Sequence, residues 1–193
     1  DRVRVGCIAQ IVNVIAPLMT NAEKTIRQTI YYPYAWALQY AHGRVLDLQG
    51  EGEAYPIKAE GLRADFAKNE LVPFLDVVAT HNPQNGQVAL FMLNRDTTGE
   101  RDLTVSWQAP TPTRVLACQT LTGRDLKASN TFDKPNNVVP RALDAPQAGA
   151  SMTFRLPAGS YTVVQLATRR FRSAAASRKR SGRALECSGP WPS

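Results

Sequence analysis

The sequence predicts a mainly β fold: an antiparallel, jelly-roll-like β-sandwich over residues 44–168, preceded by one strand–helix unit and followed by a basic tail. Many short apolar runs, separated by turn signals and without helical patterns between them, are typical of a two-sheet sandwich. A strand and a helix alone cannot close a core. We therefore expect residues 1–43 to be the last βα unit of a larger α/β domain, and residues 169–193 to be disordered.

The first expected element is a buried strand over residues 3–9, which ends at Gln10. Apolar side chains alternate along it, and Cys7 is expected to act as a small core residue. A helix is expected at residues 29–40, because aromatic side chains recur there every four residues and so share one face. That spacing is the usual mark of a buried face, so we expect Trp36 to pack in a core.

The sandwich region is expected to hold eight strands, each rich in apolar and β-branched residues. The clearest hairpin signal is Asn85-Gly86, which stands between two apolar runs. Residues 123–150 are poor in strand formers, and we expect them to be an excursion packed over the sandwich. The expected strands are 45–48, 55–59, 74–80, 88–93, 103–107, 114–120, 152–156 and 161–166.

The formal charge of +7 is concentrated in the tail. Residues 169–193 contain seven basic residues and one acidic residue, a net charge of +6, which leaves +1 for residues 1–168. A nearly neutral folded part gives no electrostatic argument for binding nucleic acid. The tail is either an accidental extension, read out of frame, or an interaction arm, for which salt-dependent nucleic acid binding is the alternative hypothesis.

The three cysteines are widely spaced and form no CxxC motif, so neither a disulfide framework nor a zinc site is expected. Two histidines cannot build a His-rich metal site, and no Gly-rich phosphate loop is present, so we expect no metal and no cofactor. The apolar stretch at residues 8–19 is too short and too polar to span a bilayer. These features favour a reducing, cytoplasmic setting without a membrane partner.

Several motifs occur in a fixed order along residues 1–168. They are residues 1–3, 7–20, 27–34, 73–80, 93–96, 130–131, 135–140 and 156–164. Together they closely resemble the α-L-arabinofuranosidases of glycoside hydrolase family 51. Residues 7–20 are similar to the last strand of that family's (β/α)₈ barrel, and the later motifs to its C-terminal sandwich. The resemblance thus implies that residues 1–43 end a barrel and that residues 44–168 form the sandwich domain.

The resemblance implies a retaining glycosidase that removes terminal α-L-arabinofuranosyl groups from arabinoxylan, arabinan and related oligosaccharides. Retention uses two carboxyl groups about 5–5.5 Å apart, which in this family are glutamates on earlier barrel strands. Neither is present here, so we expect no catalytic residue in this chain and no activity of the chain alone. Separately, we expect the full-length form to be a homo-oligomer. The glutamates at positions 23, 51, 53, 60 and 70 are not assigned to catalysis.

Gln10 is the expected substrate-binding residue. It stands where the carboxyl end of a barrel strand would be, which is where such barrels build their active sites. From spacing alone, an amide that caps or bridges the backbone is the favoured interpretation of this position. The resemblance implies that the glutamine of the Ala-Gln-x-Val-Asn motif contacts arabinose next to the scissile bond. Asn13, Gln28 and Trp36 are further candidates, with structural roles open for each.

A second hypothesis makes the sandwich a non-catalytic carbohydrate-binding module. Such a module needs an exposed aromatic platform, and most aromatic residues of the β region alternate into apolar strands. The candidates are Tyr55, Phe66, Phe74, Phe91, Trp107, Phe132, Phe154 and Tyr161.

Overall fold

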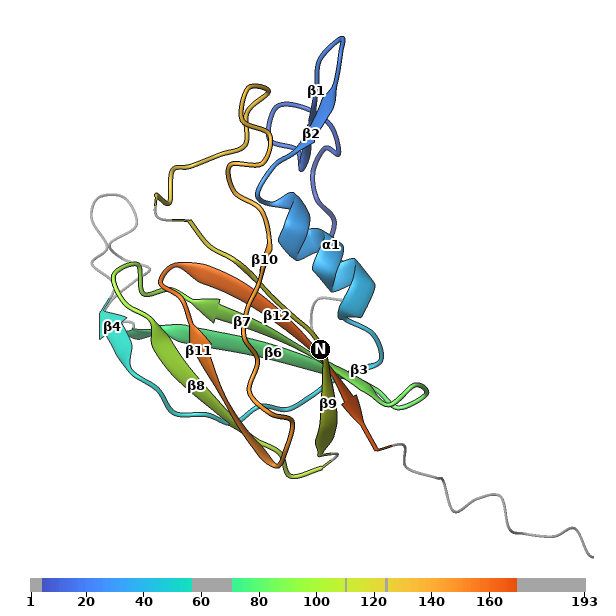
Figure 1. Ribbon diagram of the computed structural model, residues 1–193, viewed down its shortest axis with the longest axis vertical. Coiled ribbons are helices and arrows are strands. Elements are labelled where there is room, and N and C mark those ends of the chain that lie inside the picture. Colours follow the sequence, from blue (N-terminus) through green and yellow to red (C-terminus); the bar gives the residue numbers. More distant parts are fainter. Residues whose placement is uncertain (1–4, 57–70, 110, 124, 170–193) are drawn as a thin grey trace, which may run out of the picture.

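The computed structural model describes residues 5–56, 71–109, 111–123 and 125–169 (Figure 1). Within these ranges the chain is mainly β, and the only helix is α1 (Tyr31–Tyr40). The strands are β1 (Leu18–Thr20), β2 (Thr25–Arg27), β3 (Arg44–Val45), β4 (Ala54–Pro56), β5 (Leu71–Pro73), β6 (Leu75–Asn82), β7 (Gln87–Asn94), β8 (Arg101–Ser106), β9 (Pro112–Leu121), β10 (Arg141–Ala142), β11 (Ser151–Leu156) and β12 (Ser160–Thr168). Apart from Arg169, the tail predicted to be disordered lies outside the described residues.

The sandwich has one large and one small sheet. The large sheet has six strands in the order β10-β9-β12-β7-β6-β3, and the small one pairs β11 with β8. All of these pairings are antiparallel, as the sequence predicts. Separate two-stranded sheets join β1 to β2 and β4 to β5. Figure 1 shows β8 and β11 lying across the larger sheet.

The main core fills the space between the two sheets. Along β11, Met152, Phe154 and Leu156 are buried and alternate with exposed residues, so one face of this strand points inward. They pack against side chains of the large sheet, among them Leu90 and Val164. The alternation that predicts this strand from the sequence is therefore the alternation that builds the core.

The opposite face of the large sheet is covered by α1. Trp36 is 5% exposed and packs with Phe91 and Val163 of β7 and β12. Its indole lies nearly parallel to the ring of Tyr161, with ring centroids 6.1 Å apart. The prediction that Trp36 lies in a core is confirmed. Because β7 is covered on both faces, its sequence reads as a continuous apolar run rather than an alternating one.

The strand predicted for residues 3–9 is not formed over its described part. Residues 5–9 have no strand conformation, and Cys7 is exposed, so the prediction of a small core residue is wrong. An isolated strand is not stable, because its backbone groups need the ladder of a neighbouring strand. No described strand pairs with residues 5–9.

The hairpin predicted at Asn85-Gly86 is confirmed, and it joins β6 to β7. Gly86 has a φ of +67°, and its N–H donates to the carbonyl of Asn82 at 2.9 Å. A left-handed conformation of this kind favours glycine. The strand predicted at 45–48 is shorter than expected, since β3 ends at Val45.

The turn after β7 is braced by charged groups. The Asp96 carboxylate accepts hydrogen bonds from the backbone and hydroxyl of Thr98, and these bonds hold the pKa of Asp96 well below its usual range. The guanidinium of Arg101 lies 2.8 Å from the Asp96 carboxylate and also forms an ion pair with Glu53. This cluster fixes the turn between β7 and β8.

Candidate functional site

Gln10 opens a tight loop that leads into β1. Its side chain is exposed, and within the described part of the chain its carboxamide makes no hydrogen bond to protein. The alternative in which Gln10 bridges the backbone therefore finds no support among these residues. A free carboxamide has two N–H donors and one acceptor oxygen, which suit the hydroxyls of a sugar.

The backbone of this loop is strained. Gln10, Asn13 and Val14 have φ values of +61°, +63° and +57°, in the left-handed region. That region is unfavourable for a β-branched residue such as Val14. Strain of this kind persists only where the surroundings enforce it, and it concentrates at functional sites.

Asn13 holds the loop closed from inside. Its carboxamide oxygen accepts the N–H of Thr20 at 2.7 Å, and its amide nitrogen donates to the Thr20 hydroxyl at 3.2 Å. The backbone N–H of Asn13 also donates to the carbonyl of Leu18 at 2.7 Å. The structure thus gives Asn13 a structural role, with its polar atoms directed at β1.

The other candidates from the sequence are also engaged in structural contacts. Gln28 donates through Nε2 to the carbonyl of Asn130 at 2.9 Å, and Trp36 is buried against the large sheet. The structure therefore does not bring Gln28 and Trp36 to the surface beside Gln10. Of the four candidates, Gln10 alone is an exposed side chain.

Several large apolar side chains on the segment of Gln10 and on α1 are exposed, among them Val14 at 79% and Leu38 at 63%. We refer to these exposed side chains together as the N-terminal apolar surface. On α1, Tyr34 and Leu38 lie opposite the face that carries Trp36, so this helix is apolar on both sides, a pattern typical of a helix covered from all directions. The members of the surface are Val5, Ile11, Val12, Val14, Ile15, Ile30, Tyr34 and Leu38.

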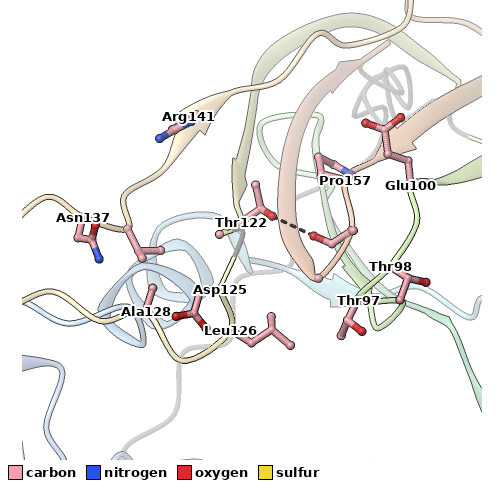
Figure 2. A pocket seen from close by; sticks show the side chains of 14 residues that line it. Thr97, Thr98, Glu100, Thr122, Asp125, Leu126, Ala128, Asn137, Arg141 and Pro157 are labelled. Carbon is pink, nitrogen blue, oxygen red and sulfur yellow. Dashed lines mark hydrogen bonds between the residues drawn. The ribbon is translucent and has the colours of Figure 1, made fainter.

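A second feature, which the sequence does not predict, is an open cleft of about 960 Å³ at the loops that join the sandwich strands (Figure 2). Threonine hydroxyls, the carboxylates of Glu100 and Asp125, and the guanidinium of Arg141 line it. The Thr122 hydroxyl donates to the carbonyl of Ala158 at 2.9 Å across one wall. No residue of the Gln10 loop or of α1 lines this cleft. Its lining comes from the β7–β8 loop, the β9–β10 excursion with the first residue of β10, and the β11–β12 turn, which share no motif, so no sequence signal marks it.

The structure describes three of the five glutamates that the sequence analysis leaves unassigned. Glu53 is bound in the ion pair with Arg101, and Glu23 and Glu51 are exposed. Glu60 and Glu70 lie outside the described residues. No group of three or more potential metal ligands occurs in the described part of the chain, and no helix there is long and apolar enough to cross a membrane.

The aromatic platform that a carbohydrate-binding module requires is not found on the described β region. Phe91 and Phe154 are buried, and the other described aromatic candidates are half-buried. Phe66 lies outside the described residues. Tyr55 and Phe74 pack on each other, with centroids 4.9 Å apart, and Arg101 covers the ring of Phe74. These contacts identify them as structural side chains.

Comparison with known families accounts for both the sandwich and the Gln10 loop. A sequence model described as the alpha-L-arabinofuranosidase C-terminal domain matches residues 1–160. The chain belongs to this family. The match begins before the Gln10 loop and ends at the first residue of β12. One family model therefore covers both the Gln10 loop and most of the sandwich.

Relatives of the chain agree with this assignment. It is 34% identical over 145 residues to an intracellular exo-alpha-(1->5)-L-arabinofuranosidase of Streptomyces lividans, covering 75% of this chain and 20% of that protein. An exo-alpha-(1->6)-L-arabinofuranosidase of Bifidobacterium longum is 29% identical over 170 residues, covering 86% and 31%. The structure of a family 51 alpha-L-arabinofuranosidase from Bifidobacterium longum matches with a TM-score of 0.74 at 32% identity, covering 86% of this chain and 31% of that one. The chain thus spans between a fifth and a third of the length of these relatives.

Proposed function

We propose that this chain is the C-terminal part of a retaining α-L-arabinofuranosidase, which hydrolyses terminal α-L-arabinofuranosyl residues of arabinoxylan and arabinan oligosaccharides. Residues 1–43 would end the catalytic (β/α)₈ barrel, and residues 44–168 would be its C-terminal sandwich. The observation that carries the proposal is the family match over residues 1–160, which includes the Gln10 loop. The catalytic glutamates would lie on the part of the relatives that this chain does not span.

The N-terminal apolar surface supports this reading. An apolar helix face next to an unpaired apolar segment is costly in water, since burial contributes about 25 cal/mol for each Å² of apolar area. A barrel packed on this surface would bury Tyr34 and Leu38 and supply strand partners for residues 5–9. The surface is thus the proposed contact with the rest of the enzyme.

In the proposed mechanism, Gln10 binds and does not react. Its carboxamide would donate to, and accept from, hydroxyls of the arabinose next to the scissile bond. Retention places a nucleophile and an acid/base carboxyl about 5–5.5 Å apart, and both would come from upstream strands. Binding contacts that strengthen in the transition state raise the rate, so Gln10 would contribute to kcat/KM without exchanging a proton.

Linkage preference is not part of the proposal, because similar relatives carry different linkages in their names, α-(1→5) and α-(1→6). We propose a cytoplasmic location, supported by the word intracellular in the name of the Streptomyces relative. We also propose that the full-length protein is a homo-oligomer.

Replacing Gln10 by alanine in the complete protein is expected to lower kcat/KM for an aryl α-L-arabinofuranoside. The loss of polar contacts to the sugar costs about 1–3 kcal/mol, which corresponds to a decrease of roughly 5- to 150-fold. Steady-state kinetics measure the effect. The isolated chain is expected to be inactive and serves as the negative control.

Gln39→Ala is the matched control, since Gln39 is an exposed glutamine of α1. It is expected to leave kcat/KM unchanged. Equal kinetics for Gln10→Ala and the unaltered enzyme would reject the binding role of Gln10. An absence of arabinofuranosidase activity in the complete protein would reject the function as a whole.

A further inference from the structure

The excursion between β9 and β10 is attached to the hairpin of β1 and β2 rather than packed only on the sandwich. Figure 1 shows this yellow-to-orange connection running beside that hairpin. Its central residue is Asn130, which is 1% exposed although it lies more than 100 residues from the hairpin in sequence. A buried carboxamide must have its hydrogen bonds satisfied, so its partners indicate what it does.

The side chain of Asn130 makes three hydrogen bonds, which use both of its N–H donors and its carbonyl oxygen. Its amide nitrogen donates to the carbonyl of Arg27 at 2.8 Å and to that of Val138 at 3.0 Å. Its oxygen accepts the N–H of Val138 at 2.8 Å. One carboxamide therefore joins β2 to both ends of the loop that runs from Asn130 to Val138.

Two side chains of the hairpin segment return this connection. Gln28 donates to the backbone carbonyl of Asn130 at 2.9 Å, and the ammonium of Lys24 donates to the carbonyl of Phe132 at 2.6 Å. In these two bonds the hairpin segment donates to the excursion, whereas in the Asn130–Arg27 bond the excursion donates to the hairpin. We name this set of contacts, made by Asn130, Arg27, Gln28, Lys24 and Phe132, the excursion clamp.

The clamped hairpin is continuous with the Gln10 loop. Arg27 pairs with Leu18 across the hairpin, and Thr20 follows on the same strand as Leu18. Both residues bind Asn13. The N–H of Thr20 donates to the carboxamide oxygen of Asn13 at 2.7 Å, and the N–H of Asn13 donates to the carbonyl of Leu18 at 2.7 Å. The link from Asn130 to the loop thus combines these hydrogen bonds with the covalent backbones of β1 and β2, which are joined beside Arg27 by the bond from the N–H of Gln28 to the carbonyl of Pro17 at 2.8 Å.

We propose that Asn130 is a positioning residue, which holds the strained Gln10 loop in its sugar-facing conformation through the β1–β2 hairpin. The backbone of Asn13 and Val14 is left-handed, and such strain relaxes unless its surroundings over-determine it. The hairpin has only three residues in each strand, too few to be stable alone, so an outside support is needed. The part of this inference that concerns the sugar rests on the proposed function of Gln10.

The first test is hydrogen exchange on this chain, with mass spectrometry or NMR reporting on residues 10–27. In Asn130→Ala, the amides of Asn13 and Thr20 should exchange about ten times faster, because the loop loses a hydrogen-bonded support and opens locally more often. Asn137→Ala is the matched control, because Asn137 bonds only within the excursion, to the carbonyl of Ser129 at 3.2 Å. It should leave these amides unchanged.

A second variant protects the test against a loss of folding in Asn130→Ala. Gln28→Ala removes one bond of the clamp from a half-buried site and leaves Asn130 in place. It should speed exchange at the same two amides by a smaller factor. Unchanged exchange in Gln28→Ala, or in a folded Asn130→Ala, would overturn the proposal.

The second test separates this inference from the proposed function by a double-mutant cycle in the complete enzyme. If Asn130 acts through Gln10, Asn130→Ala lowers kcat/KM in the unaltered background but causes little further loss in Gln10→Ala. Losses that multiply would mean that Asn130 supports the fold in general, and would refute the positioning role. If Gln10→Ala alone had no effect, the proposed function would fail, while the exchange experiment would still decide whether the clamp holds the loop.

Discussion

Replacing Phe154 by alanine is expected to lower the free energy of unfolding by about 3–5 kcal/mol. Phe154 is 1% exposed and lies between the two sheets, where it is the largest of the fully buried side chains. Truncation at this position removes the transfer energy of the ring and leaves a cavity that the rigid sheets cannot fill. A loss of this size is a large share of the stability of a typical domain.

Urea unfolding followed by tryptophan fluorescence measures this loss. Arg155→Ala is the control from the neighbouring position, where the side chain points outward and pairs with Glu100 at the surface. An exposed ion pair contributes about 0–1 kcal/mol, so the control should change stability little. Similar losses in the two variants would contradict the inward and outward assignment along β11.

Replacing Trp36 by alanine is expected to cost about 3–5 kcal/mol as well, for a different reason. Trp36 fixes α1 to the large sheet through Phe91, Val163 and the stacked ring of Tyr161. Its loss should separate the helix from the sheet and expose apolar area on both. The same change should increase hydrogen exchange in residues 31–40 more than in β12.

Leu38→Ala provides the control on the same helix. Leu38 is 63% exposed, leucine and alanine both favour helices, and its side chain does not face the sheet. In this chain it should change stability by less than about 0.5 kcal/mol. A Leu38→Ala effect as large as that of Trp36→Ala would show that the two faces of α1 are assigned the wrong way round.

The sequence predicts the elements whose stability depends on neighbours close in the chain or on a strict alternation. β11 and the β6–β7 hairpin are of this kind, because side-chain alternation and Asn85-Gly86 are visible without any structure. The helix is predicted by the spacing of Tyr32, Trp36 and Tyr40. Each of these signals lies within one short window of the sequence.

Other elements depend on contacts that no short window contains. The strand predicted at residues 3–9 has the right composition but finds no pairing partner among the described residues. β10 has two residues and pairs with β9, while β1 and β2 have three residues each, pair with one another and are bonded to the excursion through the excursion clamp. The role of Asn130 likewise depends on Arg27, a partner more than 100 residues away.

The candidate site could be predicted only in part. The resemblance of the Ala-Gln-x-Val-Asn motif to a known family directs attention to Gln10, and the structure shows this side chain exposed. The left-handed backbone at Asn13 and Val14 could not be foreseen, since valine avoids that conformation. It arises from the bonds between Asn13 and Thr20, which fold the loop against the preference of its residues.

The most direct test of the account is a crystal structure of the complete protein with arabinose bound. We expect the Gln10 carboxamide to lie about 3 Å from a pentose hydroxyl, with two upstream glutamates at the sugar and the N-terminal apolar surface covered by the barrel. Arabinose bound at a site that Gln10 does not reach, or an N-terminal apolar surface left open to solvent, would contradict the account.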